Sequence, residues 1–555
     1  MNVWEVNVND YLKKRKHFDN RLAVLKENRT KYEPEWKEIR NYLAPDCGCF
    51  NDASADKNSK KDAFYKQNIN TLPAFYFKNL AAALLGNLTP GRLRWFKLAV
   101  SNETREESIW LGKVTHKMYD IFNGASLYEH LHGAFYESAL FGPNTIGMQR
   151  DSKTVVDFVP STIGECYFAE GAKGVIDTCY RRFAMSAIQL YEMFPDTISE
   201  KVKMCLERDN PETLFNVIHA IEVNPRYLPQ WGNKLNKPFI SVYYLEDDKE
   251  SDFLEYKGMS YFPYLVARWD KSGNQVYGNG IGRIILGDVK SLQAYERDLA
   301  KASKKKISPP LKGSVDLKNA IKDVSADGIT YTNDPNGLTP LYNVNYETRE
   351  ALENINRILQ RIYSQTYNDL FYTLINKDKT MSATEAGAIQ QEKLSMLGSV
   401  VDRFQNEFLK PLIQGTFLIG LESGEFPDMP KSLIGKELDI RYQSLLSMAQ
   451  ELSDLTNVER YLQFIASAGS LNPDALMKPN MLAITNFYAD RLGIDLSLTN
   501  TDKQVRDWKE QQLAAQREQL QAQQQMQAIE SGAKAAKDYA QADTISGGAI
   551  RELLG

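Results

Sequence analysis

The chain has 555 residues, of which 43% are hydrophobic and 25% are charged, and its formal net charge is −4. This length is sufficient for about three to four domains with cores of their own, and the composition excludes a disordered chain. The slightly acidic balance excludes a protein that binds nucleic acid over its whole surface, although it allows contact with DNA at one ring of side chains.

The first half of the chain is predicted to combine helices with short strands. Helical composition and spacing, and a proline directly after the first segment, predict helices over residues 10–44, 64–87 and 114–141. Segments that are rich in β-forming residues and bounded by turn residues predict strands at 155–159, 240–245 and 264–269. This half of the chain is therefore expected to be an α+β region.

Two long helices around a turn-rich segment follow. The first, predicted over residues 287–303, leads into Lys304, Lys305 and Lys306, and Pro309 and Pro310 prevent its continuation. The second, over residues 346–373, has apolar positions at spacings of three and four, as expected for helices that pack side by side. These positions are Leu352, Ile355, Leu359, Ile362, Thr366 and Leu370.

The last third of the chain is predicted to be mainly helical. A polar break at residues 374–381 precedes a helix over 383–421, which has a broad apolar face and contains Pro411, a residue expected to kink it. Residues 511–527 are about half glutamine and can form a weakly amphipathic helix or stay loose. Residues 531–555 are expected to be mobile.

No catalytic or ligand-binding signature emerges from the sequence. Tyr277 to Gly282 resembles a dinucleotide fingerprint, but Arg283 stands where the third glycine should be. Cys47 and Cys49 are too close for a usual zinc pair, and no second pair completes four ligands. No run reaches the roughly 18 apolar residues of a membrane span. We expect no catalytic residue, cofactor, metal or membrane segment.

Four fragments follow one another in the last third of the chain: Met381-Ser-Ala-Thr-Glu385, Gln391-Glu-Lys393, Leu397-Gly-Ser-Val400 and Glu407-Phe-Leu-Lys-Pro-Leu-Ile413. In this order they resemble the head-to-tail connector, or portal, proteins of short-tailed bacteriophages. The residues that carry the family motif are Met381, Thr384, Glu385, Gln391, Glu392, Lys393 and Gly398. The resemblance extends over residues 25–510.

The resemblance implies an α+β, predominantly α-helical portal fold that assembles into a homododecameric ring. Its parts would be, in order, a wing (1–285), a first stem helix (286–304), a small α/β clip (305–345), a second stem helix (346–373), a tunnel loop (374–382), a long kinked helix (383–421), a helical crown region (422–505) and a Gln-rich tail (506–555).

The function that the resemblance implies is a ring at a unique capsid vertex, assembled in the host cytoplasm. It would nucleate head assembly, form the channel for genome packaging and ejection, and dock first the terminase large subunit and then the tail adaptor or tail proteins. Further partners would be the major capsid and scaffolding proteins. ATP would be hydrolysed by the terminase, so the chain itself is expected not to be an enzyme.

Double-stranded DNA would pass through the ring without sequence recognition. The resemblance places Asn376, Lys377 and Lys379 in the tunnel loop, and Lys304, Lys305 and Lys306 at the mouth of the clip. Each of these lysines can equally be an ordinary solvated residue. A second reading of the sequence is a helical oligomeric scaffold or adaptor of the virion that does not conduct DNA.

Overall fold

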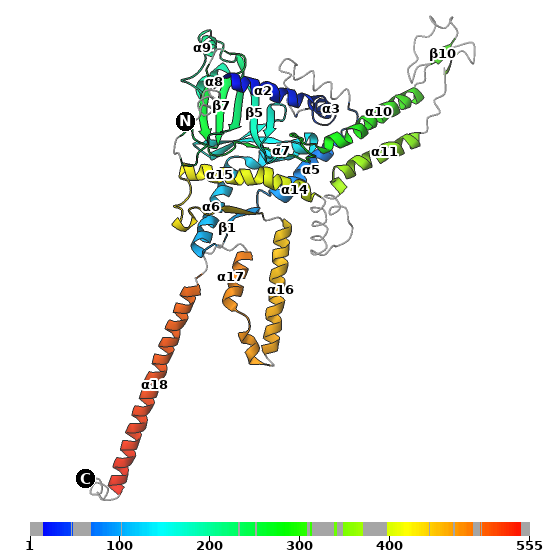
Figure 1. Cartoon of the computed structure of the whole chain (residues 1–555). Helices are drawn as coiled ribbons and strands as arrows, with labels where there is room; N and C mark the ends of the chain where they lie inside the picture. The colour runs from blue at the N-terminus through cyan, green and yellow to red at the C-terminus, as the bar shows by residue number, and fades with distance from the viewer. Residues whose placement is uncertain are drawn as a thin grey trace. The chain divides into compact units, whose positions relative to one another are not determined.

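We describe the protein from a computed structural model (Figure 1). The structure describes residues 15–45, 47, 68–101, 103–230, 234–249, 252–307, 311–313, 338–340, 348–369, 397–442, 445–469, 472–491, 500 and 502–545. The chain divides into two compact units. The first comprises Met1–Asn102 and Lys113–Met448, and the second comprises Glu103–Gly112 and Ala449–Gly555.

The predicted N-terminal helices are present but are divided differently. The helix expected over residues 10–44 is two helices, α2 (Arg15–Thr30) and α3 (Glu33–Leu43), because Pro34 starts a new helix at the first turn of α3. The helix expected over 114–141 is also two, α6 (Arg105–Gly124) and α7 (Leu127–Phe141), because Ser126 between them has the left-handed φ of 54°. The helix expected over 64–87 corresponds to α5 (Leu72–Leu88).

The largest sheet of the first unit has five antiparallel strands in the order β4-β5-β6-β7-β8. These strands are β4 (Cys166–Glu170), β5 (Ile176–Ser186), β6 (Leu214–Val223), β7 (Phe239–Leu245) and β8 (Glu255–Met259). Phe18, Leu22 and Leu25 of α2 pack on one face, with Tyr180, Ile218, Val242 and Tyr244. The short helices α8 (Ala187–Met193) and α9 (Glu200–Glu207) cover part of the other face, over Val217, Tyr243 and Leu245.

Three smaller sheets complete the strands of the described residues. One has the order β3-β2-β9, formed by β2 (Thr145–Asp151), β3 (Val155–Ser161) and β9 (Tyr264–Leu265). The strand predicted over 264–269 is therefore shorter than expected. The pair β1 (Phe96–Val100) and β12 (Leu438–Tyr442) brings distant parts of the chain together, with Leu98 opposite Ile440. The last pair is β10 (Leu311–Gly313) and β11 (Leu338–Pro340).

Two long helices, α10 (Ile281–Ile307) and α11 (Thr348–Gln365), lie side by side in the first unit (Figure 1). The first begins before the predicted residue 286 and the second ends before the predicted residue 373. The end of α11 follows from Tyr367, whose positive φ of 56° is incompatible with a continuing right-handed helix.

The described part of the predicted helix 383–421 is interrupted by a π-helical segment. It consists of α14 (Gly398–Phe404), the π-helix Gln405–Leu409 and α15 (Lys410–Ser423). Pro411 lies in the first turn of α15 and cannot donate a hydrogen bond to the carbonyl four residues earlier. A π-turn just before a proline is one way in which a helix accommodates that loss. Most of the expected apolar face is buried, including Leu397, Phe404, Phe408, Leu412 and Ile413.

The second unit is helical over its described residues. It contains most of α16 (Leu445–Gly469), a 3₁₀ turn at Pro473–Met477, α17 (Met481–Arg491) and α18 (Asp502–Ile545). The hydroxyl of Tyr488 donates a hydrogen bond of 3.1 Å to the carbonyl of Leu455, which joins α17 to α16. Residues 531–545, which we expected to be mobile, continue the 44-residue helix α18. None of the described helices combines the length and apolar character that crossing a membrane requires.

Candidate functional site

The candidate site is the hairpin formed by α10 and α11. Buried side chains on α10 run from Ile281 to Gln293, and from residue 294 onward its side chains are partly or fully exposed. The buried residues of α11 are Ala351, Ile355, Ile358, Ile362 and, just beyond it, Thr366. Leu352, which the spacing placed in the packed seam, is 49% exposed, because the packed face is rotated toward Ile358.

Polar contacts fix the first half of α10 to the rest of the unit. The Gln293 side chain is 2% exposed, and its Oε1 accepts from the N–H groups of Ile69 (2.8 Å) and Asn70 (3.0 Å), while its Nε2 donates to the Asn70 carbonyl (2.7 Å). Arg361 of α11 bonds to Asp288 of α10 at 2.7 Å. A buried amide with all these partners is satisfied, so it fixes the position of α10 relative to the start of α5.

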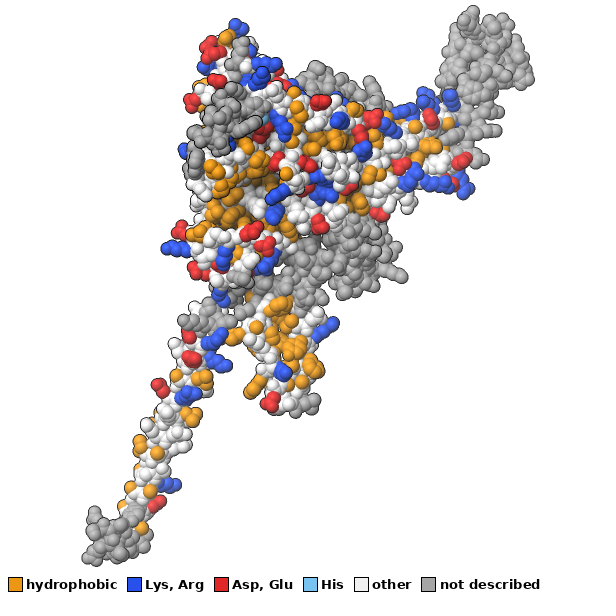
Figure 2. All heavy atoms as spheres, in the orientation of Figure 1, with side chains coloured by type: hydrophobic (Ala, Val, Ile, Leu, Met, Phe, Trp, Pro, Cys, Tyr) orange, Lys and Arg blue, Asp and Glu red, His pale blue; other side chains and the backbone are white. Residues whose placement is uncertain are grey.

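The hairpin is basic although the chain is acidic. Seven Lys and Arg residues and three Asp and Glu residues lie on α10, and three and two respectively lie on α11, which gives a net charge of +5 against −4 for the whole chain. Figure 2 shows these blue side chains along both helices. Lys304, Lys305 and Lys306 form the exposed last turn of α10, where positive charge is favourable to the helix dipole. This arrangement suits contact with an extended polyanion.

Glycines just before and at the start of α10 allow two helix ends to approach closely. Gly278 has a φ of +68°, and a Cβ there would lie 2.4 Å from the carbonyl oxygen of Asp270. A Cβ at Gly280 or Gly282 would lie 2.6 Å or 2.4 Å from the carbonyl oxygen of Leu140, at the end of α7. The run that resembled a dinucleotide fingerprint is thus explained by backbone packing.

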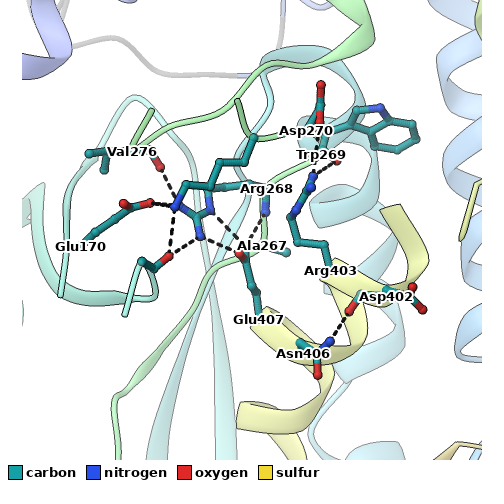
Figure 3. A network of polar contacts seen from close by, with 12 residues as sticks. Glu170, Ala267, Arg268, Trp269, Asp270, Val276, Asp402, Arg403, Asn406 and Glu407 are labelled. Atoms are coloured by element: carbon teal, nitrogen blue, oxygen red, sulfur yellow. Dashed lines mark hydrogen bonds and ion pairs between the residues drawn. The ribbon is translucent and has the colours of Figure 1, made fainter. Parts of the chain in front are cut away.

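A fully buried arginine lies between the sheets and the π-helical segment (Figure 3). The Arg268 side chain is 1% exposed. Its guanidinium donates to Glu407 at 2.5 Å and 3.1 Å, and to Glu170 at the end of β4. It also donates to the carbonyls of Gly174 (2.9 Å) and Val276 (3.4 Å). The Arg268 side chain therefore connects its own segment with the turn after β4, the segment before α10 and the π-helical segment.

The charge of Arg268 is stabilised in spite of its burial. Burial lowers the pKa of the guanidinium, but the hydrogen bond and charge of Glu407, and then those of Glu170, raise the pKa above its usual value. Nearby, Arg403 of α14 donates to the carbonyl of Trp269 at 2.8 Å and lies 3.6 Å from Asp270. The network is a structural anchor: removing one partner would leave a buried charge without compensation.

Comparison with known proteins identifies the family. A sequence model of the bacteriophage head to tail connecting proteins matches residues 15–499. The chain belongs to this family. The connector resemblance drawn from the sequence motifs is therefore confirmed.

Two curated relatives are similar to this connector-family chain over nearly its whole length. The portal protein of Salmonella phage epsilon15 is 28% identical over 544 residues, 96% of this chain and 97% of that protein. A probable portal protein of Bordetella phage BPP-1 is 31% identical over 548 residues, 97% of this chain and 98% of that protein. The family likeness thus extends beyond the fragments on which the resemblance rested.

The structure of this connector-family chain places only part of the predicted site. Gly398 is the first residue of α14 and Pro411 lies in the first turn of α15, whereas Lys304 to Lys306 lie in the last turn of α10 (Figure 1), so the structure does not bring these residues together. The remaining predicted site residues lie outside the described residues: Asn376, Lys377, Lys379, Met381, Thr384, Glu385, Gln391, Glu392 and Lys393.

The sequence reasoning missed the Arg268 network. Glu407 begins a fragment quoted for the connector family, and Arg268 lies next to Trp269 in a β-rich segment. No local sequence pattern at either position predicts a buried ion pair, because the partners are 139 residues apart in the chain. Among the described residues no group of three or more His, Cys, Asp or Glu side chains is placed to hold a metal ion.

Proposed function

We propose that this chain is a phage portal protein, of which copies form a homododecameric ring at one vertex of the capsid. The proposal is supported by membership of the connector family and by the end-to-end similarity to two proteins named as portal or probable portal proteins. The ring would nucleate head assembly and form the channel through which the genome enters and leaves.

The observation that carries the conduit is the basic hairpin α10–α11. Its net charge of +5 is concentrated on two helices of a chain whose total is −4. Exposed lysines on a rigid helix contact phosphates without reading the base sequence, as a channel for any genome requires. Every neutralised phosphate adds salt-dependent affinity, and strong affinity would hinder movement of the duplex. A small number of such contacts per subunit is therefore compatible with sliding.

The tunnel-loop proposal concerns residues outside the described part of the chain. Asn376, Lys377 and Lys379 would project toward the duplex, by analogy with the connector family. Its test is the double substitution Lys377→Ala and Lys379→Ala in a packaging assay. Unchanged packaging and unchanged DNA retention would contradict a role for these two side chains.

The second unit supplies surfaces for contacts between neighbouring subunits. Tyr461 and Phe464 of α16 are 45% and 65% exposed, and Trp508 and Ile529 of α18 are 64% and 71% exposed. Large apolar side chains on isolated helices are covered in stable proteins by a partner. In a ring, a heterologous contact repeated around the symmetry axis would cover them in every copy. The crown would comprise residues 422–505 and its tail residues 506–555, and of these residues 449–555 belong to the second unit.

The partners would follow from the ring's position in the virion. The clip, residues 305–345, would dock the terminase large subunit during packaging and the tail adaptor or tail proteins afterwards. The wing, residues 1–285, would face the major capsid and scaffolding proteins. The terminase would supply ATP hydrolysis, so the portal itself would catalyse no reaction.

The experiment that tests the proposal is electron microscopy of the purified full-length protein, with end-on views classified without imposed symmetry. Rings with a central opening as wide as a DNA duplex are the expected result, and the classes would count the subunits. Closed oligomers without an axial opening would contradict the conduit and favour a non-conducting scaffold or adaptor. Adding capsid and scaffolding proteins to a sample that stays monomeric distinguishes a missing assembly partner from a wrong proposal.

A further inference from the structure

Two neighbouring hollows in the first unit form one groove beside the five-stranded sheet. One has a volume of about 900 Å³ and the other of about 500 Å³. Both are lined by Val159, Arg181, Phe183 and Met193, so they are adjacent and together form a longer groove, which we call the β5 groove. Each hollow alone has the size of a small-molecule pocket. The combined length suits an extended peptide better than a compact ligand.

The floor of the β5 groove is the face of the sheet opposite the one on which α2 packs. Directly opposite residues of paired strands project on the same side, so Arg181, His219 and Tyr243 form one row of this face. All three line the larger hollow. Its facing wall comes from other elements, with Arg150 on β2 and Ile419 on α15. The groove is therefore built entirely within the first unit.

The lining of the β5 groove is basic. It contains five Lys and Arg side chains and two carboxylates, which gives a net charge of +3. The basic residues are Arg150, Arg181, Lys234, Lys237 and Lys257, and the acidic residues are Glu192 and Glu422.

Part of this positive charge has no counter-ion within the chain. Arg181 is paired with Glu165 at 2.9 Å and Lys257 with Glu255 at 2.8 Å. Arg150, by contrast, is exposed and forms no ion pair with any residue that the structure describes. A partner whose charge complements this lining carries acidic side chains.

Apolar side chains lie among these charges. Met185, Met193 and Met259 contribute to the lining, and Met193 is 45% exposed. Methionine adapts its shape to different partners and is common on peptide-binding surfaces. Single-stranded nucleic acid requires aromatic rings that are free to stack with bases. The Phe183 ring instead packs on the cluster under α8 and α9 and lies 4.7 Å from the Arg181 guanidinium. The side chains thus favour a peptide over a nucleic acid.

The β5 groove also borders a strand edge that its neighbour leaves uncovered. β4 pairs with β5 only as far as Arg181, and the N–H of Arg182 donates to the carbonyl of Glu165 at 2.8 Å. Beyond this point β5 continues to Ser186 and pairs with β6 alone among the described strands. The last residues of β5 therefore have one unpaired edge.

The hydrogen-bond phase of β5 shows which backbone groups this edge presents. The N–H of Ala187 donates to the carbonyl of Thr213 on the β6 side at 3.0 Å. Because the bonding side alternates along a strand, the N–H and C=O of Ala184 point away from β6, toward the uncovered side. Ala184 is exposed and lines the smaller hollow. An extended segment can pair with it there.

We propose that the β5 groove binds an extended segment of a partner protein in which acidic and apolar residues alternate. One residue of this segment pairs with Ala184 and continues the sheet where β4 ends. Successive side chains of a strand point to opposite sides, so apolar side chains contact Phe183 and Met193 while acidic ones lie near Arg150 and Lys257. Backbone pairing contributes affinity, and the alternating side chains provide specificity.

The source of the segment rests on the proposed function. In a portal, the capsid or scaffolding proteins that would face the wing would supply it. Binding itself belongs to each copy of the chain and does not require a ring. A peptide-binding result and a ring observed by electron microscopy can therefore succeed or fail independently.

The first test is fluorescence anisotropy of a labelled nine-residue peptide in which Glu and Leu alternate, titrated with the full-length protein. Replacing Glu by Lys in the peptide should weaken binding by about tenfold or more, and so should Arg150→Gln combined with Lys257→Gln. Lys509→Gln with Lys534→Gln removes the same charge from α18 and should leave binding unchanged. Absence of binding, or an equal loss in both double variants, would overturn the proposal.

The second test locates the peptide on the backbone without altering the protein. The bound Glu-Leu peptide should slow hydrogen exchange of the segment that contains Ala184, and N-methylation of the peptide's central residues should weaken binding. Equal binding of the methylated peptide, or unchanged exchange around Ala184, would overturn strand pairing. A single-stranded DNA of mixed sequence that displaces the peptide and binds more tightly would assign the groove to nucleic acid instead.

Discussion

Arg268 and Glu407 form a two-bond pair, with Nη2 2.5 Å from Oε1 and Nε 3.1 Å from Oε2. Bidentate arginine–carboxylate pairs fix orientation as well as distance. Glu407 belongs to the π-helical segment Gln405–Leu409, and Arg268 lies three residues after the end of β9. The pair therefore fixes the long helical segment against the sheets of the same unit.

Removing the cation of this network should strongly destabilise the first unit. Arg268→Met leaves Glu170 and Glu407 with no guanidinium, and such a loss typically costs about 3–5 kcal/mol of unfolding free energy. Arg403→Met is the control, because it removes a neighbouring arginine whose partner Asp270 is 65% exposed. The measurement is thermal and urea unfolding of both variants. Equal stability of the two variants would contradict the anchor role.

The glycine at the start of α10 should not tolerate a side chain. In Gly282→Ala the new Cβ would lie 2.4 Å from the Leu140 carbonyl, so α10 or α7 must shift, and we expect a clear fall in the unfolding temperature. Gly287→Ala in the same helix meets nothing within 4 Å and should be neutral or stabilising by up to about 1 kcal/mol. If both substitutions have the same effect, helix propensity alone would explain the result.

The sequence predicted the helices better than the buried contacts. The broad face with Phe404, Phe408 and Leu412 follows from helical spacing, and the structure buries all three. In α11 the spacing of three and four fits two adjacent faces, and only the packing partner selects Ile358 over Leu352. A local pattern cannot make that choice.

Breaks and ion pairs were harder to predict for physical reasons. The break at Ser126 places a non-glycine residue in the left-handed region, and the only nearby signal for it is Gly124, which ends α6. The partners of Arg268 lie 98 and 139 residues away, at Glu170 and Glu407. Contacts of this range depend on the completed fold, so the sequence did not indicate the Arg268 network. The lysines at the end of α10, by contrast, follow from the local sequence alone.

A buried histidine should make stability depend on pH. His219 stacks on Tyr243 with ring centroids 3.9 Å apart, and its ring nitrogens bond to the Tyr264 hydroxyl (2.6 Å) and the Ser241 hydroxyl (3.0 Å). Burial, and then the charges of Lys257 and Arg181, hold the pKa of His219 well below its usual value. The neutral ring is therefore the form that the folded protein accommodates.

The sign of the pH effect follows from this lowered pKa. Below about pH 6.5 the unfolded chain binds a proton at His219 that the folded chain does not. The free energy of unfolding therefore decreases as the pH is lowered, by up to about 1.4 kcal/mol per pH unit. Unfolding temperatures between pH 7.5 and 5.5 should therefore fall less steeply in His219→Gln. His116→Gln, at an exposed position of α6, should leave the slope unchanged. Parallel slopes in all three proteins would contradict the prediction.

The lysines at the end of α10 should contribute to duplex binding if the proposed conduit is correct. Replacing Lys304, Lys305 and Lys306 by Gln should weaken non-specific binding of duplex DNA by the assembled protein. It should also lower the dependence of log K on log salt by about 0.9 for each phosphate that the variant no longer neutralises. Because all three side chains are exposed, the unfolding temperature should fall only slightly, through the lost interaction with the helix dipole.

A triple substitution elsewhere separates position from net charge. Lys509, Lys534 and Lys537 are exposed on α18, and replacing them by Gln removes the same charge. Fluorescence anisotropy of a labelled duplex, titrated at several salt concentrations, should show a smaller salt slope for the α10 triple than for the α18 triple. An equal decrease of the salt slope in both variants would mean that duplex binding depends on overall charge. It would contradict a contact between the end of α10 and the DNA.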